Sequence, residues 1–161
     1  MRREFTLKKS QSTGTQDVQN NIAGSEAVSI HVRRGDYVTN THTNQKHGIC
    51  PPEYYQQAIK YIQTQVNDPH FFVFSDDIGW VKSHLKIPDP VNYVSNNDIS
   101  SQEELLLMSS CKHNIIANSS FSWWGAWLNQ YPEKIVIAPK KWFNLETIDT
   151  RDLIPETWIR L

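Results

Sequence analysis

The chain has 161 residues, enough for one domain of ordinary size and too few for two comfortable ones. Hydrophobic residues make up 39% and charged residues 20%, which is typical of a folded globular chain. The formal net charge of -1 argues against a protein that holds nucleic acid or anionic lipid by bulk charge. The two cysteines, Cys50 and Cys111, lie far apart and form no CxxC motif, so a disulfide scaffold is not expected.

Two segments bear on the expected location of the chain. The N-terminal sequence MRREFTLKKS has no apolar core and is not a secretory signal. The stretch from Asn114 to Pro132 carries no charge, but repeated Asn, Ser and Gln residues interrupt it, so it is not expected to span a membrane. We therefore expect a cytoplasmic chain, with a peripheral position at the inner membrane face as an alternative.

The first elements in chain order follow a polar stretch. Residues 8–26 are rich in Gln, Asn, Ser and Gly and are predicted to be a helix remnant or connector rather than core, so residues 1–26 are assigned to a connector or remnant of a preceding region. A domain of residues 27–161 then opens with the strand AVSIHVR, and after a polar loop Pro51 and Pro52 begin the helix PEYYQQAIKYIQTQV. FFVF (71–74) is the second predicted strand, and DDIGWVKSHL is a short helix with acidic residues at its start.

The remaining elements continue the alternation. VNYV (91–94) is the third predicted strand, and Ser100 and Ser101 precede Glu103 and Glu104 in a doubled capping box that begins the helix EELLLMSSC. NIIA (near 115–118) is the fourth strand, SFSWWGAWLNQ a helix and KIVIAP (134–139) the fifth strand, before a mixed C-terminal segment. Strands that are apolar on both faces and alternate with helices predict an α/β fold: a Rossmann-like parallel sheet with helices on both faces.

In such a sheet the ligand lies at the carboxyl ends of the strands. The loops there are polar after three of the predicted strands. They contain Arg33, Arg34, Gly35, Asp36 and Tyr37 after the first, Ser75, Asp76 and Asp77 after the second, and Asn118, Ser119, Ser120 and Phe121 after the fourth. This convergence predicts a binding site at one edge of the sheet.

Each of these groups has a functional and a structural interpretation. Arg33 and Arg34 can present guanidinium forks to a phosphate or pair with surface carboxylates. Ser119 and Ser120 can form an anion site at a helix start or simply cap the helix. Asp76 and Asp77 can cap the next helix or accept hydrogen bonds from a nucleoside. His31, inside the first strand, is either a structural hydrogen-bonding residue or part of the site.

Several familiar sites are missing from the sequence. It contains no GxxxxGK[ST], GxGxxG, HExxH or GxSxG motif, and its histidines and carboxylates do not group at metal-ligand spacing. Arg34-Gly35-Asp36 spells an adhesion tripeptide, but it directly follows a buried strand. What remains is a metal-free phosphate cradle of arginines and hydroxyls, which suits a transferase from which a nucleoside diphosphate departs.

Three motifs carry a resemblance to a known family. HVRRGDY (31–37), FVFSDD (72–77) and ANSSFSWWGAWL (117–128) resemble, in order and spacing, the α-1,2-fucosyltransferases of glycosyltransferase family 11. The likeness covers about residues 27 to 145. The HxRRxD pattern is shared with other fucosyltransferases, whereas SSFSWWGAWL is far more particular.

The resemblance implies a GT-B architecture of two Rossmann-like domains, of which this chain is the C-terminal, GDP-fucose-binding half. It implies inverting transfer of L-fucose from GDP-fucose to the 2-hydroxyl of a galactose-terminated glycan, with no metal and no cofactor. Arg33 and Arg34 would bind the diphosphate and stabilise departing GDP, and Ser119 and Ser120 would hold phosphate oxygens. His31 would contact the nucleotide, Asp36 would brace the arginine loop, and Asp77 or Asp76 would hydrogen-bond guanine or ribose.

In the family, more than a hundred residues usually precede the HxRRGDY motif and form the acceptor-side domain, whereas only 30 residues precede the motif here. We therefore expect a missing or separate N-terminal acceptor domain, and weak transfer by this chain alone. The alternatives are a non-catalytic GDP-sugar-binding module, a fucosyltransferase of another linkage, and a nucleic-acid binder that stacks bases on tryptophans. The near-neutral charge disfavours the last, so no nucleic-acid partner is expected.

Overall fold

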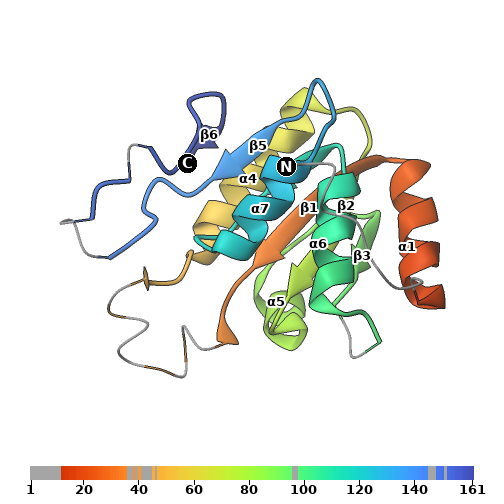
Figure 1. Cartoon of the computed structure of the whole chain (residues 1–161), viewed down its shortest axis with the longest axis horizontal. Coiled ribbons are helices and arrows are strands. Elements are labelled where there is room, and N and C mark those ends of the chain that lie inside the picture. Colours follow the sequence, from red (N-terminus) through yellow and green to blue (C-terminus); the bar gives the residue numbers. More distant parts are fainter. Residues whose placement is uncertain are drawn as a thin grey trace.

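One parallel β-sheet runs through the molecule, with helices packed on both of its faces (Figure 1). The computed structural model describes residues 12–35, 38, 40, 45, 47–95, 98–144, 148–150 and 152–161. Within them six strands lie in the order β3-β2-β1-β4-β5-β6, and every neighbouring pair is parallel. They are β1 Glu26–Val32, β2 Pro69–Ser75, β3 Val91–Tyr93, β4 His113–Ile115, β5 Val136–Ala138 and β6 Ile159–Arg160. The predicted Rossmann-like α/β fold is confirmed.

The sixth strand was not expected from the sequence, which predicts five. β6 is only two residues long and pairs with β5 at the sheet edge, with Ile137 opposite Ile159. Backbone bonds on either side of it extend the pairing, from the Lys140 N–H to the Leu161 carbonyl and from the Leu161 N–H to the Ala138 carbonyl. So short a strand has no alternation of its own, and only its neighbour reveals it.

Alternation along the central strand separates two apolar cores. Val28, Ile30 and Val32 of β1 pack against α4 (Pro52–Gln65) and α5 (Ile78–His84) on one face. The opposite face is covered by α1 (Thr13–Ala23), α6 (Ser101–Ser110) and α7 (Ser120–Leu128). Because both faces of β1 are covered, six of its seven residues are buried.

Local sequence signals set where the helices begin. Pro51 and Pro52 stand at the start of α4, where a missing backbone N–H costs nothing. The predicted capping box of α6 is present: the Ser100 hydroxyl accepts from the Glu103 N–H, and the Glu103 carboxylate accepts from the Ser100 N–H. These N-terminal signals set where α4 and α6 begin and so where the chain turns back over the sheet.

The segment predicted to be a helix remnant or connector contains a helix, and the expectation that it lies outside the core is wrong. α1 buries Thr15 and Ile22 and packs against α6. The Glu103 carboxylate of α6 accepts hydrogen bonds from the Ser12 N–H and the Thr15 hydroxyl, both at 2.9 Å. The domain boundary at residue 26 stays a prediction, but the segment before it contributes to the core of the residues after it. None of the helices in these ranges is long and apolar enough to cross a membrane.

Candidate functional site

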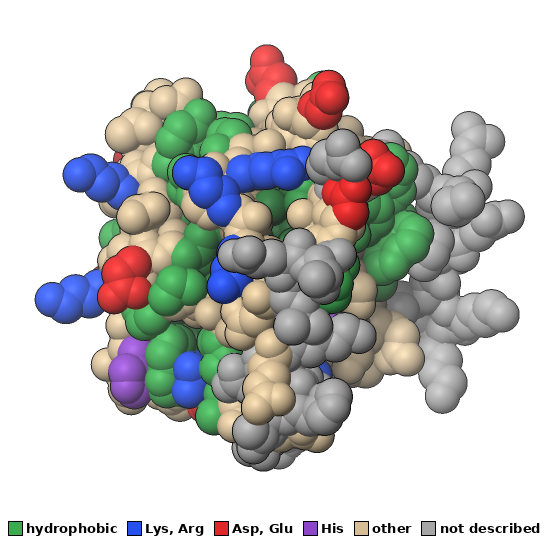
Figure 2. Space-filling view, turned by 90° about the vertical axis from the view of Figure 1, so that its left-hand side faces the viewer, with side chains coloured by type: hydrophobic (Ala, Val, Ile, Leu, Met, Phe, Trp, Pro, Cys, Tyr) green, Lys and Arg blue, Asp and Glu red, His purple; other side chains and the backbone are tan. Residues whose placement is uncertain are grey.

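The strand order changes direction between β1 and β4. From β1 the chain runs outward to β2 and β3 on one side, and from β4 outward to β5 and β6 on the other. Parallel sheets bind ligands outside the carboxyl ends of the strands at such a switch point. The strand ends point toward the left of Figure 1, and Figure 2 views the molecule from that side, where several Lys and Arg side chains lie exposed beside acidic ones. The polar loops after β1, β2 and β4 are therefore neighbours, as the sequence predicts.

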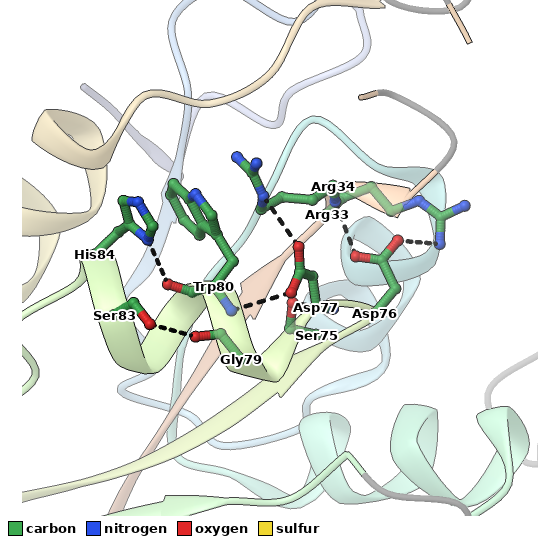
Figure 3. A network of polar contacts seen from close by, with 9 residues as sticks. All are labelled: Arg33, Arg34, Ser75, Asp76, Asp77, Gly79, Trp80, Ser83 and His84. Carbon is green, nitrogen blue, oxygen red and sulfur yellow. Dashed lines mark hydrogen bonds and ion pairs between the residues drawn. The ribbon is translucent and has the colours of Figure 1, made fainter. Parts of the chain in front are cut away.

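The loops after β1 and β2 are joined by ion pairs. Arg33 Nη1 lies 3.1 Å from Asp76 Oδ2, and the Arg34 backbone N–H donates to Asp76 Oδ1 at 2.8 Å. Arg34 Nε lies 3.5 Å from Asp77 Oδ2. Figure 3 shows the two guanidinium groups directed apart, with Arg33 facing Asp76 and the Nε of Arg34 facing Asp77. The structure thus realises the pairing with carboxylates, and its partners are the two aspartates predicted to contact the nucleoside.

Arg34 also contacts an aromatic ring that the sequence analysis did not include in the site. Its guanidinium carbon lies 3.8 Å from the centroid of the Trp80 ring in α5. On α5 the Trp80 and His84 rings stack at 4.6 Å with 9° between their planes. The only sequence signal for this contact is a tryptophan one turn into the helix that follows Asp77.

Asp77 has two structural roles at once. Its Oδ1 accepts the Trp80 backbone N–H at 3.0 Å and so caps α5, as one of the two sequence interpretations expects. Its own N–H donates to the Ser75 hydroxyl at 3.0 Å. The other carboxylate oxygen is left for the ion pair with Arg34, so the start of α5 and the arginine share one side chain.

His31 is buried at the end of β1 on the α6 and α7 face. Its ring lies 5.6 Å from that of Phe121 in the first turn of α7. Burial, reinforced by the nearby positive charge of Arg33, lowers the pKa of His31 from 6.5 to about 3. The ring is therefore neutral at physiological pH. Its Nδ1 is buried without a hydrogen-bond partner among the described residues, so the hydrogen-bonding capacity of this atom is unused in the structure.

On the β4 side, α7 begins beside His31 and carries both predicted serines. Ser119 is the N-cap residue of α7, is buried, and makes no side-chain capping bond, while Ser120 is exposed in the first turn. The capping interpretation of Ser119 is therefore wrong for its side chain. The first backbone N–H groups of α7 point toward the same edge of the sheet as the arginines, because α7 follows β4.

Asn118 ties together three loops rather than facing a ligand. Its side-chain amide donates to the carbonyls of His47, Gly48 and Trp142, and its Oδ1 accepts from the Cys50 thiol at 3.4 Å. Beside it opens a pocket of about 320 Å³ between the loop before α4 and the loop after β5. Burial raises the pKa of Cys50 to about 11, so this thiol is inert.

The predicted site residues fall into three groups. Arg33, Arg34, Asp76 and Asp77 form one connected cluster. The second group lies at the start of α7: Ser119 and Ser120 begin this helix, and His31 contacts its Phe121. Asp36 lies outside the described residues. Among those residues no three His, Cys, Asp or Glu side chains gather where they could hold a metal ion.

Known proteins with similar sequences include several glycosyltransferases. The chain is 44% identical to an alpha-1,2-colitosyltransferase of Escherichia coli over 87% of its own length and 49% of the relative's. It is 44% identical to the O-antigen biosynthesis glycosyltransferase WbnK of Escherichia coli over 85% and 45%, and 28% identical to galactoside alpha-(1,2)-fucosyltransferase 1 of Mus musculus over 80% and 36%.

The chain thus spans about half the length of the two bacterial relatives. No solved structure matches it significantly. The model of one family, Glycosyl transferase family 11, matches residues 2–161. With nearly the whole length matched, the resemblance of the three motifs is confirmed: the chain belongs to glycosyltransferase family 11.

Proposed function

We propose that the chain is the donor-binding part of a glycosyltransferase that transfers L-fucose, or a closely related sugar, from its GDP-linked form to the 2-hydroxyl of a galactose-terminated glycan. The observation that carries the proposal is the arginine cluster at the topological switch point, beside a buried neutral histidine that lacks a partner. Family membership supports the reaction class, and the names of the relatives support the fucosyl and colitosyl groups.

The arginines would act on the leaving group. Departing GDP gains negative charge, and fixed cations in a partly enclosed site stabilise that charge more in the transition state than in the ground state. Arg34 has a side chain only 16% exposed, so its charge is less screened than that of Arg33 at 36%. This would make metal-independent catalysis feasible at Arg33 and Arg34, with inversion at the sugar; we assign no catalytic base.

The other site residues would complete the nucleotide contacts. Neutral His31 would offer Nδ1 to the nucleotide, and Ser119 and Ser120 would offer hydroxyls to phosphate oxygens beside the amides of α7. A nucleoside contact by Asp76 or Asp77 remains a prediction, to which the structure adds their ion pairs with the arginines. The brace by Asp36 and the cytoplasmic location rest on the sequence alone.

In this proposal the acceptor binds to a second domain, as in a GT-B enzyme, and the greater length of the bacterial relatives, about twice that of this chain, supports it. One wall of a cleft binds the donor but does little to orient the acceptor, and orientation contributes many powers of ten to rate. We therefore expect GDP binding by the 161-residue chain and weak or no transfer.

Calorimetry with GDP, GMP and guanosine tests the proposal directly. GDP should bind at least tenfold more tightly than guanosine, and a chelator should change neither affinity. No GDP binding, or binding that a chelator abolishes and Mg²⁺ or Mn²⁺ restores, contradicts it. Turnover of GDP-fucose and GDP-linked colitose with lactose then separates a transferase from a module that only binds the donor.

A further inference from the structure

The indole ring of Trp80 in α5 contacts the guanidinium group of Arg34. We propose that Trp80 is a positioning residue, which holds the Arg34 guanidinium group over its ring so that Arg34 is already oriented when a diphosphate arrives. The inference rests on the proposed function, because it needs Arg34 to contact the diphosphate. The 3.8 Å separation between guanidinium carbon and ring centroid is well within the range of a cation–π contact.

The Asp77 carboxylate contacts both the start of α5 and Arg34 and so sets the distance between them. Asp77 Oδ1 accepts the Trp80 N–H, while Asp77 Oδ2 lies 3.5 Å from Arg34 Nε (Figure 3). The tryptophan and the arginine are thus tied to the same side chain from two directions. Arg34 Nε is buried and, apart from its ion pair with Asp77, makes no hydrogen bond in the described part of the chain, so the contact with Trp80 adds to the few interactions that hold the group.

The far face of the indole is also supported. His84 stacks on it with 9° between the two planes, and its Nδ1 lies 3.0 Å from the Trp80 carbonyl oxygen. Within α5 the Ser83 hydroxyl donates to the Gly79 carbonyl at 2.9 Å. Trp80 is half-buried, and Figure 3 shows its ring between the Arg34 guanidinium group and the His84 ring.

Such an arrangement matters because arginine has many rotamers. A long side chain that is free in the unbound protein loses that freedom on binding, which weakens affinity. A planar guanidinium group stacked on an aromatic ring has already lost much of it. The sequence alone does not reveal the contact between Arg34 and Trp80, because these residues are distant in the chain and come together only when β1 pairs with β2.

The test uses calorimetry on the 161-residue chain with GDP and guanosine as probes. Trp80→Leu should weaken GDP binding by about 3- to 30-fold, and Trp80→Phe by less, because a smaller ring still offers a π-face. Guanosine binding should stay unchanged in both variants. Trp127→Leu is the matched control: Trp127 also stacks on a neighbouring ring, that of Trp123 at 5.3 Å, but lies in the last turn of α7.

A double variant separates positioning from general damage to the fold. In an Arg34→Ala background, Trp80→Leu should weaken GDP binding no further, because the group it positions is gone. An equal additional loss there, or equal losses for GDP and guanosine, overturns the positioning role. If Trp80→Leu does not fold, the Trp80→Phe cycle gives the same decision.

The failure of the proposed function has a different signature. If Arg33→Ala and Arg34→Ala both leave GDP affinity unchanged, the arginines do not contact the diphosphate, and both proposals fall. If Arg34→Ala weakens GDP binding but neither Trp80 variant does, only the positioning role is overturned.

Discussion

Two polar clusters of this molecule differ in how completely their groups are hydrogen-bonded. At the joint of α1 and α6, the two carboxylate oxygens of Glu103 accept four hydrogen bonds of 2.7–2.9 Å, from Ser12, Thr15 and Ser100. At the switch point of the sheet, His31 Nδ1 is buried without a hydrogen-bond partner among the described residues, and the buried Arg34 Nε has its ion pair with Asp77 but no hydrogen bond. The hydrogen-bonding capacity of the Glu103 carboxylate is used, whereas buried polar atoms at the switch point still lack hydrogen bonds.

That difference distinguishes a structural cluster from a binding one. Leaving a buried polar atom unsatisfied costs free energy, so folded proteins rarely do it without a reason. A ligand that supplies the missing partners recovers that free energy on binding. The Glu103 cluster should therefore affect stability and leave nucleotide affinity alone. Arg33 and Arg34 should do the reverse, while the buried His31 should affect stability through its protonation. Each prediction below tests one side of this contrast.

The largest expected effect is the acid sensitivity that His31 causes. The folded-state pKa of His31 is lowered to about 3 from 6.5, so between these values the unfolded chain binds one more proton than the folded chain. Stability from neutral His31 is present above pH 6.5 and is lost as the pH falls, by about 1.4 kcal/mol for each pH unit. His31→Phe keeps a ring against Phe121 and should remove this slope.

Chemical denaturation at pH 7, 5.5 and 4.5 measures the effect. The free energy of unfolding of the wild type should fall, relative to His31→Phe, by roughly 2–3 kcal/mol between pH 7 and 4.5. Parallel curves would show that His31 titrates normally in the folded protein.

The next effect concerns the affinity for GDP. Replacing Arg33 or Arg34 by Ala removes charge-assisted hydrogen bonds worth about 1.5–3 kcal/mol, a ten- to hundredfold loss of GDP affinity. Lys should restore little at position 34, because an ammonium group lacks the planar fork that lies over Trp80. Guanosine titrations and melting temperatures are the controls. A structural role for the arginines predicts instead a lower melting temperature and equal losses for both ligands.

Local sequence signals were sufficient for most of the fold. Apolar runs such as FFVF identify buried strands, and Pro52 and the Ser100–Glu103 box mark helix starts. β6 could not be predicted, because two residues have no periodicity and depend on β5 for pairing. The packing of α1 was equally hidden, since the helix is polar and buries only Thr15 and Ile22.

The candidate site was predictable as a set of loops but not as a set of contacts. Topology alone brings the ends of β1, β2 and β4 to one edge. Which arginine pairs with which aspartate depends on side-chain rotamers, and the contact of Arg34 with Trp80 spans two different elements. Asn118 looked like a loop residue of the site, yet its amide is fully used by three backbone carbonyls.

A smaller effect on stability is expected from the complete cluster. Backbone and hydroxyl donors from Ser12, Ser100 and Thr15 lower the pKa of Glu103 from 4.5 to about 2. Its contribution to stability is therefore present above pH 4.5 and is lost as the pH falls toward 2. Glu103→Gln places an amide NH₂ where carboxylate oxygens accept, so α1 should separate more readily from α6.

Thermal melts at pH 7 and pH 3 test this, in the His31→Phe background so that His31 does not contribute. Glu103→Gln should lower Tm at pH 7, and the difference should shrink at pH 3. GDP affinity should be unchanged at pH 7. A Tm difference that is the same at both pH values would mean that the charge of Glu103 does not hold the joint.

The smallest expected effect is the difference between alanine substitutions at two glycines, Gly35 beside Asp76 and Gly79 beside Asp77. A Cβ on Gly35 would lie 2.5 Å from Asp76 Oδ2, so Gly35→Ala must rotate this carboxylate away from Arg33 and the Arg34 amide. The displaced group is the end of a flexible side chain, and an ion pair this exposed contributes only about 0–1 kcal/mol to stability. Gly35→Ala should therefore leave Tm nearly unchanged and weaken GDP binding a few-fold, because Arg33 is no longer held.

Gly79→Ala is the matched control for that substitution. Its Cβ would meet only Asp77 Oδ1, at an ordinary contact distance of 3.9 Å, and it lies inside α5, where alanine is about 0.5–1 kcal/mol more favourable than glycine. Gly79→Ala should raise Tm slightly and leave GDP affinity unchanged. Gly35→Ala should instead weaken GDP binding and leave Tm nearly unchanged. Calorimetry and melting on both variants measure this. If Gly35→Ala binds GDP as tightly as Gly79→Ala does, the orientation that Asp76 gives to Arg33 is irrelevant to the ligand, and the arginine cluster is a surface ion-pair network like any other.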